Sequence, residues 1–587
     1  MIARVHSAIL QGIDAVACEV EADVAMGDSG EVKLVGMAET SVRESVSRIQ
    51  AALRNSNFRW PGPKVTINLA PADVRKDSAA FDLPIAVAAS LAGNLFQSTI
   101  ADDFLMAGEL ALDGRVRPIR GALAMAMLAQ AQGKRGIILP AENAAEAAVV
   151  AGLDVIPVDS FAQAAAFLTG ELSIEPRHVD LDEIFATAGR YDVDFADVRG
   201  QESAKRALTI AAAGHHNILL IGPPGSGKTM LAKRIPTVLP PLTPEESLET
   251  TRVYSARGLL SPGQSLMAVR PVRTPHHSSS SAALIGGGII PQPGEVSLAH
   301  HGVLFLDEFP EFARPTLEMI RQPLEDRVVT IPRVHSTLKF PASIMLVAAM
   351  NPCPCGYFTD PTRKCKCSPF QVERYMGQLS GPLIDRIDIH VEVPPVPYQQ
   401  LRASGEGADG LSSQQMRDQV QRAREIQRQR FATHDTTHDA APKNHEIAME
   451  NNETADTAQP GQPQSDRPHA GFFPDIETPP PADTAHGDES PDATAPSPPA
   501  DRLPPAPRNA TTTNATMSPR QVRQFCKLDP AGEVILKQAM TELGLSARAH
   551  DKVLRVARTI ADMEGQPTIQ PHHLAEAIQY RRLDRRF

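Results

Sequence analysis

The sequence predicts an α/β protein built around a parallel-sheet core, with a second α/β domain before the core and a helical part after it. Three observations predict this class. A strand, a glycine-rich loop and a helix follow one another directly at residues 217–234. Two more apolar strands, at 303–306 and 343–349, end in polar residues. Beyond residue 518, apolar residues recur at helical spacing.

The first third of the chain is expected to form a separate domain, because a chain of 587 residues is long enough for about three domains. Residues 1–172 alternate short apolar strands with alanine-rich helices. They include a strand at 64–70, a helix at 121–131 and a strand at 136–140. The acidic, mixed stretch 173–195 is typical of a linker.

The composition changes abruptly between about residues 431 and 515, where about fifteen of the chain's 51 prolines fall. Such a polar, proline-rich segment cannot bury enough apolar surface to offset the entropy lost on ordering. We therefore expect residues 403–517 to hold the start of a helical lid and a disordered insertion. Residues 518–587 are expected to form the C-terminal helical lid domain.

Composition and charge limit the function classes. Hydrophobic residues make up 42% of the chain, yet no window approaches the ~18 uncharged apolar residues of a membrane span. The first residues lack the basic and apolar regions of a secretory signal. We expect a soluble, cytoplasmic protein with no membrane contact. The net charge of −11 argues weakly against a surface coated in nucleic acid, but it leaves local DNA binding open.

The glycine-rich loop has the pattern G-x-x-x-x-G-K-T between a strand and a helix, as phosphate binding requires. Backbone N–H groups of such a loop converge on phosphates, and the helix N-terminus adds partial positive charge. We expect the Lys228 ammonium to reach the β- and γ-phosphates of ATP and the Thr229 hydroxyl to bind Mg²⁺. The predicted nucleotide-binding residues are Gly222, Pro223, Pro224, Gly225, Ser226, Gly227, Lys228 and Thr229.

Acidic and amide side chains follow the other two apolar strands. Asp307 is expected to hold Mg²⁺, and Glu308 to polarise the water that attacks the γ-phosphate. Asn351 ends the third strand, where its amide can orient the same water. An acidic helix cap and a turn-forming asparagine are the structural alternatives. The histidines at 276 and 277 are interpreted as polar loop residues.

Several of these motifs together resemble a known family. Residues 197–388 resemble the magnesium-chelatase branch of the AAA+ ATPases, and the whole chain outside the insertion resembles the competence protein ComM (YifB) family. The motifs that carry the likeness are PHHSS at 275–279, GGG at 286–288, PGEVSLAH at 293–300, NPCPCG at 351–356, SARA at 546–549 and RVARTIAD at 555–562. The resemblance implies an AAA+ ATPase core of magnesium-chelatase type over residues 196–402.

The family resemblance also implies a ring, a homohexamer, with each ATP at a subunit boundary. Arg386 matches the position of the arginine finger, which meets the γ-phosphate bound by the neighbouring subunit. Arg548 matches the sensor-2 arginine of the helical lid. Either arginine can neutralise charge on the phosphoryl oxygens. A surface salt bridge is the alternative for both.

Four cysteines fall within fifteen residues: Cys353, Cys355, Cys365 and Cys367. Four thiolates can satisfy a tetrahedral Zn²⁺, although the paired ligands here are closer in sequence than the usual two to four intervening residues. A structural zinc and free or redox-active thiols both remain open.

The N-terminal domain resembles the proteolytic domain of Lon, through residues 114–121 and the helix and strand that follow. Lon uses a serine activated by a lysine. Asp82 falls at the position of the serine, and Leu123 and Met125 fall at helix positions where Lon has lysines. We therefore expect a Lon-like domain without catalytic activity.

Two segments of the core are candidate DNA contacts. Residues 328–340 predict a β-hairpin that carries Arg333, His335 and Lys339, and residues 293–300 precede the second strand. In related rings such hairpins enter the pore and can grip a phosphate backbone. Ordinary surface hairpins are the alternative.

Three function classes follow. ComM-like proteins promote branch migration during natural transformation and homologous recombination, which implies an ATP-dependent DNA helicase acting on branched or single-stranded DNA through the ring pore. The alternative is a magnesium-chelatase-type ATPase that remodels a metal-insertion partner protein. A complete ATP site argues against the third class, a non-enzymatic scaffold.

Overall fold

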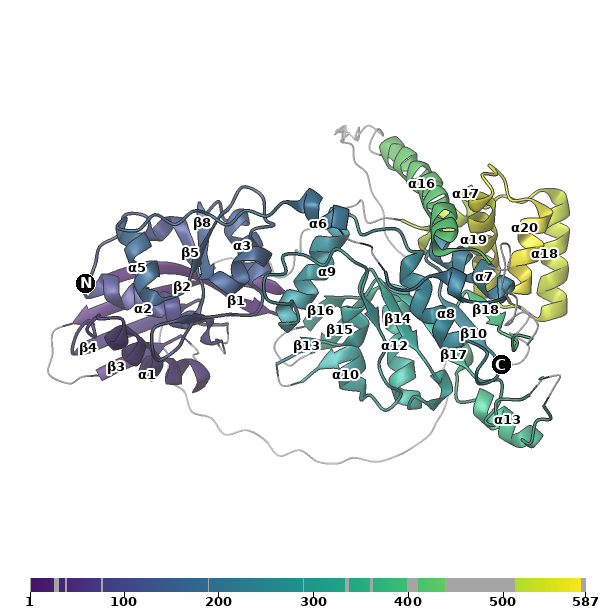
Figure 1. The fold of residues 1–587 in the computed structure, drawn as a ribbon, viewed down its shortest axis with the longest axis horizontal. Helices are drawn as coiled ribbons and strands as arrows, with labels where there is room; N and C mark the ends of the chain where they lie inside the picture. The colour runs from purple at the N-terminus through teal and green to yellow at the C-terminus, as the bar shows by residue number, and fades with distance from the viewer. Residues whose placement is uncertain are drawn as a thin grey trace, which may run out of the picture. The chain divides into compact units, whose positions relative to one another are not determined.

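The computed structural model describes residues 2–25, 31–36, 40–74, 76, 78–187, 189, 191–288, 290–332, 337–358, 360, 363–397, 410–438 and 512–581 (Figure 1). The described residues of Met1–Gln429 and Thr513–Phe587 form one compact unit. Most of the predicted insertion, residues 439–511, lies outside the described residues. Across the described ranges, no helix is long and apolar enough to cross a membrane.

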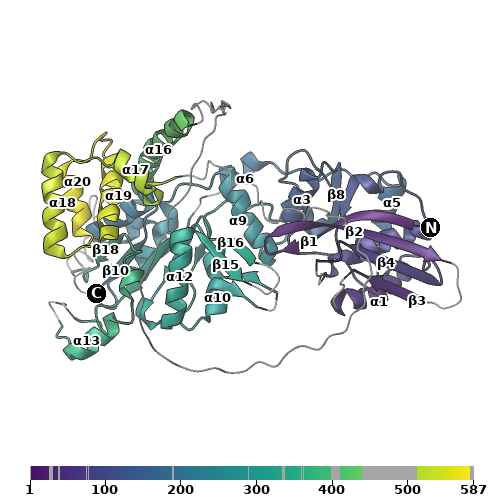
Figure 2. The same cartoon turned by 180° about the vertical axis from the view of Figure 1, so that it is seen from behind.

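The N-terminal domain is built on a seven-stranded mixed sheet. Its strand order is β3 (Glu31–Val35), β4 (Lys64–Ala70), β2 (Asp14–Ala25), β1 (Ile2–Gln11), β5 (Phe104–Met106), β8 (Gly136–Pro140) and β9 (Asp154–Val158). The long strands β1 and β2 pair antiparallel and are clearest from behind (Figure 2). The strands predicted at 64–70 and 136–140 are confirmed as β4 and β8.

The helices of this domain follow the predicted alternation. They are α1 (Thr40–Asn55), α2 (Asp82–Ala92), α3 (Ala122–Ala131), α4 (Ala144–Ala147) and α5 (Phe161–Thr169), with a small hairpin of β6 (Glu109–Leu110) and β7 (Val116–Arg117). Helix α2 is buried along nearly its whole length. The domain therefore has its own hydrophobic core, and α6 (Leu181–Thr187) lies in the predicted linker.

The nucleotide-binding core is a five-stranded, all-parallel sheet. Its order is β11 (Val272–Arg273), β14 (Val303–Leu306), β17 (Met345–Met350), β10 (Ile218–Ile221) and β18 (Ile389–Glu392). Every residue of β10, β14 and β17 is buried, as expected of strands covered on both faces. The three predicted core strands are confirmed. The edge strands β11 and β18 were not predicted.

Helices and hairpins surround this sheet. The helices are α7 (Glu202–Gly214), α8 (Lys228–Arg234), α9 (Pro244–Arg257), α10 (Ser281–Ile285), α11 (Glu295–Leu298), α12 (Arg314–Asp326), α13 (Pro369–Met376) and α14 (Gly381–Ile384). The hairpins are β12 (Gly286–Gly287) with β13 (Gln292–Pro293), and β15 (Val328–Pro332) with β16 (Thr337–Pro341). The hairpin predicted at 328–340 is thus confirmed.

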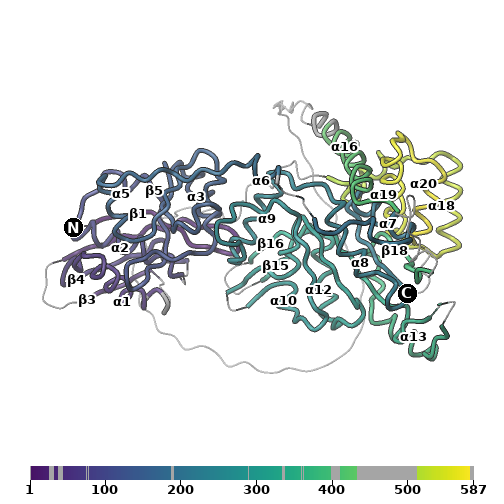
Figure 3. The backbone as a smooth tube through the Cα atoms, viewed as in Figure 1, coloured from purple at the N-terminus to yellow at the C-terminus, as the bar shows by residue number. Residues whose placement is uncertain are grey.

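The C-terminal part is helical, as predicted (Figure 3). After α16 (Ser413–His438) it holds α17 (Pro519–Phe525), α18 (Pro530–Leu543), α19 (Ala547–Met563) and α20 (Pro571–Gln579). Ser518 caps α17 by accepting from the N–H of Gln521, which is why helical structure resumes there. Helix α16 continues to His438, past residue 431, where the change in composition predicts that the insertion begins.

A buried polar network joins the helical lid to the core sheet. Lys552 on α19 lies 2.8 Å from the Asp388 carboxylate, which also accepts from the N–H of Asn217 at 3.0 Å. Burial alone would raise the pKa of Asp388, but the Lys552 ammonium and the His216 imidazole hold it well below its usual range. Because both charges lie almost out of water, each depends on the other to offset its desolvation.

Replacing Lys552 by methionine is expected to lower the melting temperature clearly, because it leaves the Asp388 carboxylate buried without its cation. Breaking such a pair costs about 3–5 kcal/mol. Thermal unfolding of Lys552→Met and of the double variant Asp388→Asn/Lys552→Met measures the effect, and the double variant should regain part of the loss. Lys537→Met, at an exposed lysine of α18, is the matched control. A single variant at Lys552 as stable as this control contradicts the account.

Candidate nucleotide-binding site

Three parallel strands of the core end at one edge of the sheet, and polar residues follow each of them. In the register, Ile221 lies beside Met350 and Leu306 lies beside Ala348. In sheets of this kind, ligands bind in the crevice outside the carboxyl ends of the strands. The phosphate-binding loop and the polar residues after β14 and β17 therefore leave the sheet together.

The phosphate-binding loop, residues 222–229, adopts a conformation that needs its glycines. Gly225 and Gly227 have φ angles of 77° and 94°, in the left-handed region that favours glycine. A Cβ at Gly222 would lie 2.2 Å from the carbonyl oxygen of Val393. Helix α8 begins at Lys228, so the last two residues of the motif form its first turn, and the strand–loop–helix order predicted from the motif is present.

Lys228 lies inside this loop and is only 8% exposed. Its Nζ donates to the carbonyl oxygens of Gly222 at 2.7 Å and Pro223 at 3.0 Å, and to Oδ1 of Asn351 at 3.1 Å. Burial lowers the pKa of Lys228, and the nearby Asp307 carboxylate opposes the shift. The structure thus brings Lys228 and Asn351 together, as expected from their places at the strand ends.

The two predicted magnesium ligands also meet. Thr229 donates from Oγ1 to Oδ2 of Asp307 over 2.7 Å. A hydroxyl and a carboxylate oxygen at this spacing are the oxygen donors that Mg²⁺ prefers beside nucleotide phosphates. These residues therefore fit a Mg²⁺–ATP complex: Thr229 and Asp307 would hold the ion, which supplies charge neutralisation between the phosphates.

Glu308 has an unusual backbone and a specific side-chain partner. Its φ of 50° lies in the left-handed region, which is uncommon for a residue other than glycine. Its N–H donates to Oδ1 of Asp307 at 2.9 Å, and its carboxylate lies 3.0 Å from Nδ1 of His277. The sequence predicts a polar loop residue at position 277, and His277 does lie in a loop. Its contact with Glu308 has no sequence signal, because β11, which precedes His277, is too short to show a period.

Gln201 is a second residue that the sequence analysis missed. Its side-chain amide donates to the carbonyl oxygens of Ser226 at 3.2 Å and Pro394 at 2.6 Å. It thereby ties the phosphate-binding loop to the segment after β18. No motif marks this residue, because the contact joins parts of the chain that are far apart in sequence.

The two predicted arginines lie together, in a cavity of about 410 Å³. Arg386 donates to the carbonyl oxygen of Pro382 at 2.7 Å and pairs with Glu325, and Arg548 lines the same cavity. The lining residues include neither the phosphate-binding loop nor Asp307 or Asn351. Within one chain the arginines therefore form a separate group.

The four cysteines also come together. The Sγ atoms of Cys353 and Cys355 lie 3.3 Å apart, and Cys365 lies 3.7 Å and 3.5 Å from them. All four Sγ atoms, including that of Cys367, lie within 4.8 Å of one another. Zn–S bonds of about 2.3 Å in a tetrahedron place sulfurs about 3.8 Å apart. Gly356, the residue after Cys355, lies close to the phosphate-binding loop, because a Cβ at Gly356 would lie 2.5 Å from Cδ of Pro224.

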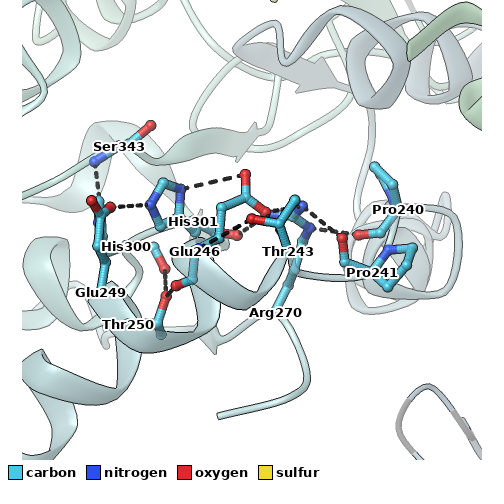
Figure 4. Close-up of polar contacts among 10 residues, drawn as sticks. All are labelled: Pro240, Pro241, Thr243, Glu246, Glu249, Thr250, Arg270, His300, His301 and Ser343. Carbon is cyan, nitrogen blue, oxygen red and sulfur yellow. Dashed lines mark hydrogen bonds and ion pairs between the residues drawn. The ribbon is translucent and has the colours of Figure 1, made fainter. Parts of the chain in front are cut away.

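Two further groups of histidine and carboxylate side chains converge, but their hydrogen bonds disfavour a metal. Glu249 lies 2.8 Å from Nε2 of His301 and 3.3 Å from Nε2 of His300, while Nδ1 of His300 accepts from the N–H of Ser343 at 3.0 Å (Figure 4). A neutral His300 therefore carries its proton on Nε2, where a metal would need a lone pair.

The second group has the same arrangement: Nδ1 of His573 accepts from the N–H of Gln570, and its Nε2 faces Glu564.

Arg270 lies near the first group, between Glu246 and the carbonyl oxygens of Pro240 and Pro241 (Figure 4). These contacts fasten α9 to the neighbouring segments, which is a structural role.

The Lon-like position in the N-terminal domain holds an ion pair. Asp82 is buried, lies 3.1 Å from Nε of Arg48, and accepts from the N–H of Leu110 at 3.2 Å. Burial raises the pKa of Asp82, and Arg48 opposes the shift. Leu123 and Met125 pack in a hydrophobic core. The residues at these positions therefore cannot supply a serine–lysine dyad.

The two candidate DNA segments differ in conformation. Pro293 ends strand β13 of the β12–β13 hairpin, and Glu295–Leu298 form helix α11, whose Val296 and Leu298 are buried, so residues 293–300 as a whole are not a hairpin. In the β15–β16 hairpin, Lys339 is exposed and lies opposite Thr330. The other two predicted contacts, Arg333 and His335, lie outside the described residues.

Three family models match successive parts of this chain. They are described as subunit ChlI of Mg-chelatase over residues 20–143, magnesium chelatase, subunit ChlI, over residues 194–401, and magnesium chelatase, subunit ChlI C-terminal, over residues 501–581. Their order follows the N-terminal domain, the nucleotide-binding core and the helical lid.

Individual relatives extend the likeness over the full length. Competence protein ComM of Haemophilus influenzae is 36% identical, covering 100% of this chain and 98% of the relative. The protein YifB of Escherichia coli is 36% identical over 99% of this chain and 97% of its own length. Lon protease 2 of Bacillus subtilis is 33% identical over 149 residues, 23% of this chain and 26% of the protease.

Proposed function

The chain belongs to the ComM/YifB family of magnesium-chelatase-like AAA+ proteins, and from this premise we propose that it is an ATP-driven motor that moves branched DNA. The family implies an ATPase that uses ATP and Mg²⁺. Our proposal adds the substrate, the assembly and the outcome: a homohexamer promotes branch migration during natural transformation or homologous recombination.

The observation that carries the ATPase is the meeting of four predicted side chains at one sheet edge. Lys228 contacts Asn351, and Thr229 contacts Asp307. A cation, a hydroxyl, a carboxylate and an amide in this arrangement match the needs of phosphoryl transfer, which depends on positioning and charge stabilisation. In this scheme Glu308 orients the attacking water.

The separation of the arginines supports an assembly with shared sites. Arg386 and Arg548 line one cavity, and the phosphate-binding loop contributes nothing to its lining. Each arginine therefore completes the site of a neighbouring subunit in our proposal, where its guanidinium neutralises charge on the γ-phosphoryl oxygens. A closed ring of such boundaries gives every subunit one complete ATP site.

DNA as the substrate rests on the family relationship and on the β15–β16 hairpin. The relative from Haemophilus influenzae is named a competence protein and matches this chain from end to end. The exposed Lys339 gives the hairpin a cation that can pair with a phosphate. The chelatase alternative, remodelling of a metal-insertion partner, predicts an ATPase that is indifferent to DNA.

We also propose that the four-cysteine cluster holds one structural Zn²⁺. The support is the close spacing of its four sulfur atoms, which all lie within 4.8 Å of one another. Because the cluster follows Asn351 and the adjacent Gly356 lies against Pro224, the metal would stiffen the segment beside the phosphate-binding loop. Free thiols are the alternative.

The DNA proposal predicts that Lys339→Glu weakens binding of a four-way junction by about tenfold or more at low salt, since every subunit loses a phosphate contact. DNA-independent ATP hydrolysis should be unaffected. Lys537→Glu, the same charge reversal on an exposed lid lysine, is the matched control. A labelled four-way junction reports branch migration, which Lys228→Ala should abolish. Wild-type hexamers that hydrolyse ATP but neither bind nor resolve branched DNA contradict the proposal.

The zinc proposal predicts about one zinc per chain in protein purified without chelator, because a four-thiolate site binds structural zinc tightly. Elemental analysis measures it. Cys365→Ser should lose the metal, whereas Cys526→Ala, at a buried cysteine outside the cluster, should keep it. Metal-free wild-type protein with four titratable thiols would establish the alternative.

A further inference from the structure

The backbone of Glu308 is held by its neighbours in the chain, but its side chain is exposed to solvent. Strand β14 before it is fully buried, and the short 3-10 helix Phe309–Glu311 follows it, so both flanks hold the residue in its left-handed conformation. The side chain is 57% exposed. An exposed glutamate samples several rotamers unless a partner holds it, because its side chain carries substantial rotamer entropy.

His277 is that partner in this structure. Its Nδ1 lies 3.0 Å from Oε2 of Glu308. An ionised carboxylate only accepts hydrogen bonds, so Nδ1 must carry the proton and donate. The carboxylate thereby has one oxygen engaged by the imidazole, and its other oxygen stays available for a water molecule.

The imidazole of His277 is held in turn by two rings. The ring of Phe312 packs edge-on against the imidazole, with ring centroids 6.5 Å apart. The ring of His276 also contacts it, with ring centroids 4.1 Å apart. Phe312 is buried and directly follows the 3-10 helix after Glu308. The same short segment therefore supplies both the carboxylate and a support for the histidine that holds it.

Strand topology explains why these residues meet. Strand β11 pairs parallel with β14, so both strands end at the same edge of the sheet. Arg273, the last residue of β11, is fixed by two hydrogen bonds to Glu295 at 2.6 Å and 2.8 Å. His277 follows on the loop after β11, and Nδ1 of His276 accepts from the N–H of Ser278, which constrains that loop.

We propose that His277 is a positioning residue for ATP hydrolysis: its Nδ1–H holds the Glu308 carboxylate in the orientation that activates the attacking water. This inference rests on the proposed ATPase and assigns a role within it. His277 contacts neither the phosphate-binding loop nor Asp307 through any interaction of the described residues, so its effect is on the chemical step and spares nucleotide binding.

Steady-state ATP hydrolysis by full-length variants tests the inference. His277→Ala is expected to lower kcat about 10- to 100-fold, the size of effect that misplacing a catalytic group produces, while KM changes by less than about twofold. His277→Asn should recover most of kcat, because the asparagine amide nitrogen occupies the position of Nδ1. Melting temperatures show whether each variant is folded.

A double-variant cycle separates positioning from a general structural role. Glu308→Gln should bind ATP and turn it over slowly, and adding His277→Ala to it should cause no further loss, because the group that His277 positions has already been neutralised. Additive losses overturn the inference, as does a His277→Ala variant with wild-type kcat or a His277→Asn variant as slow as His277→Ala. Wild-type protein that fails to hydrolyse ATP overturns the proposed ATPase and the inference with it.

Discussion

Parallel pairing of β10, β17 and β14 brings the chemistry of this protein to one edge of a sheet. Because the three strands run in the same direction and in register, the residues after each strand emerge side by side. The contacts of Lys228 with Asn351 and of Thr229 with Asp307 follow from that register. A strand in the opposite direction would carry its polar end to the far edge, so these contacts depend on the topology of the whole sheet.

Several contacts from other segments of the chain hold the residues at this sheet edge in place. The segment after β11 brings His277 to Glu308, and Gln201 ties the phosphate-binding loop to the chain after β18. Gly356, next to the cysteine cluster, lies against Pro224. The lid is fastened to the core by the buried pair of Asp388 and Lys552, close to the cavity that holds both arginines. Arg548 of the lid and Arg386 of the core therefore line one cavity together with this pair.

The sequence predicted the parts of the fold that repeat or carry a motif. Strands β10, β14 and β17 were recognisable because they are uninterrupted apolar runs, and the phosphate-binding loop was recognisable because only certain residues form it. Strand β11 has two residues and no period, so His277, which follows it, had no visible role. Within residues 293–300, the short helix α11 had no periodic signal either, because it has only four residues. Long-range pairs such as Asp388 with Lys552 leave no local signal at all.

In our proposal each chain carries two halves of different ATP sites, and rings that mix two variants provide the test. Lys228→Ala and Arg386→Ala each remove one half, so each variant alone should hydrolyse little ATP. Mixing them should restore part of the activity, because some boundaries then pair an intact phosphate-binding loop with an intact arginine. Mixed rings that demonstrably contain both variants and remain as inactive as either one alone would contradict a site shared between subunits.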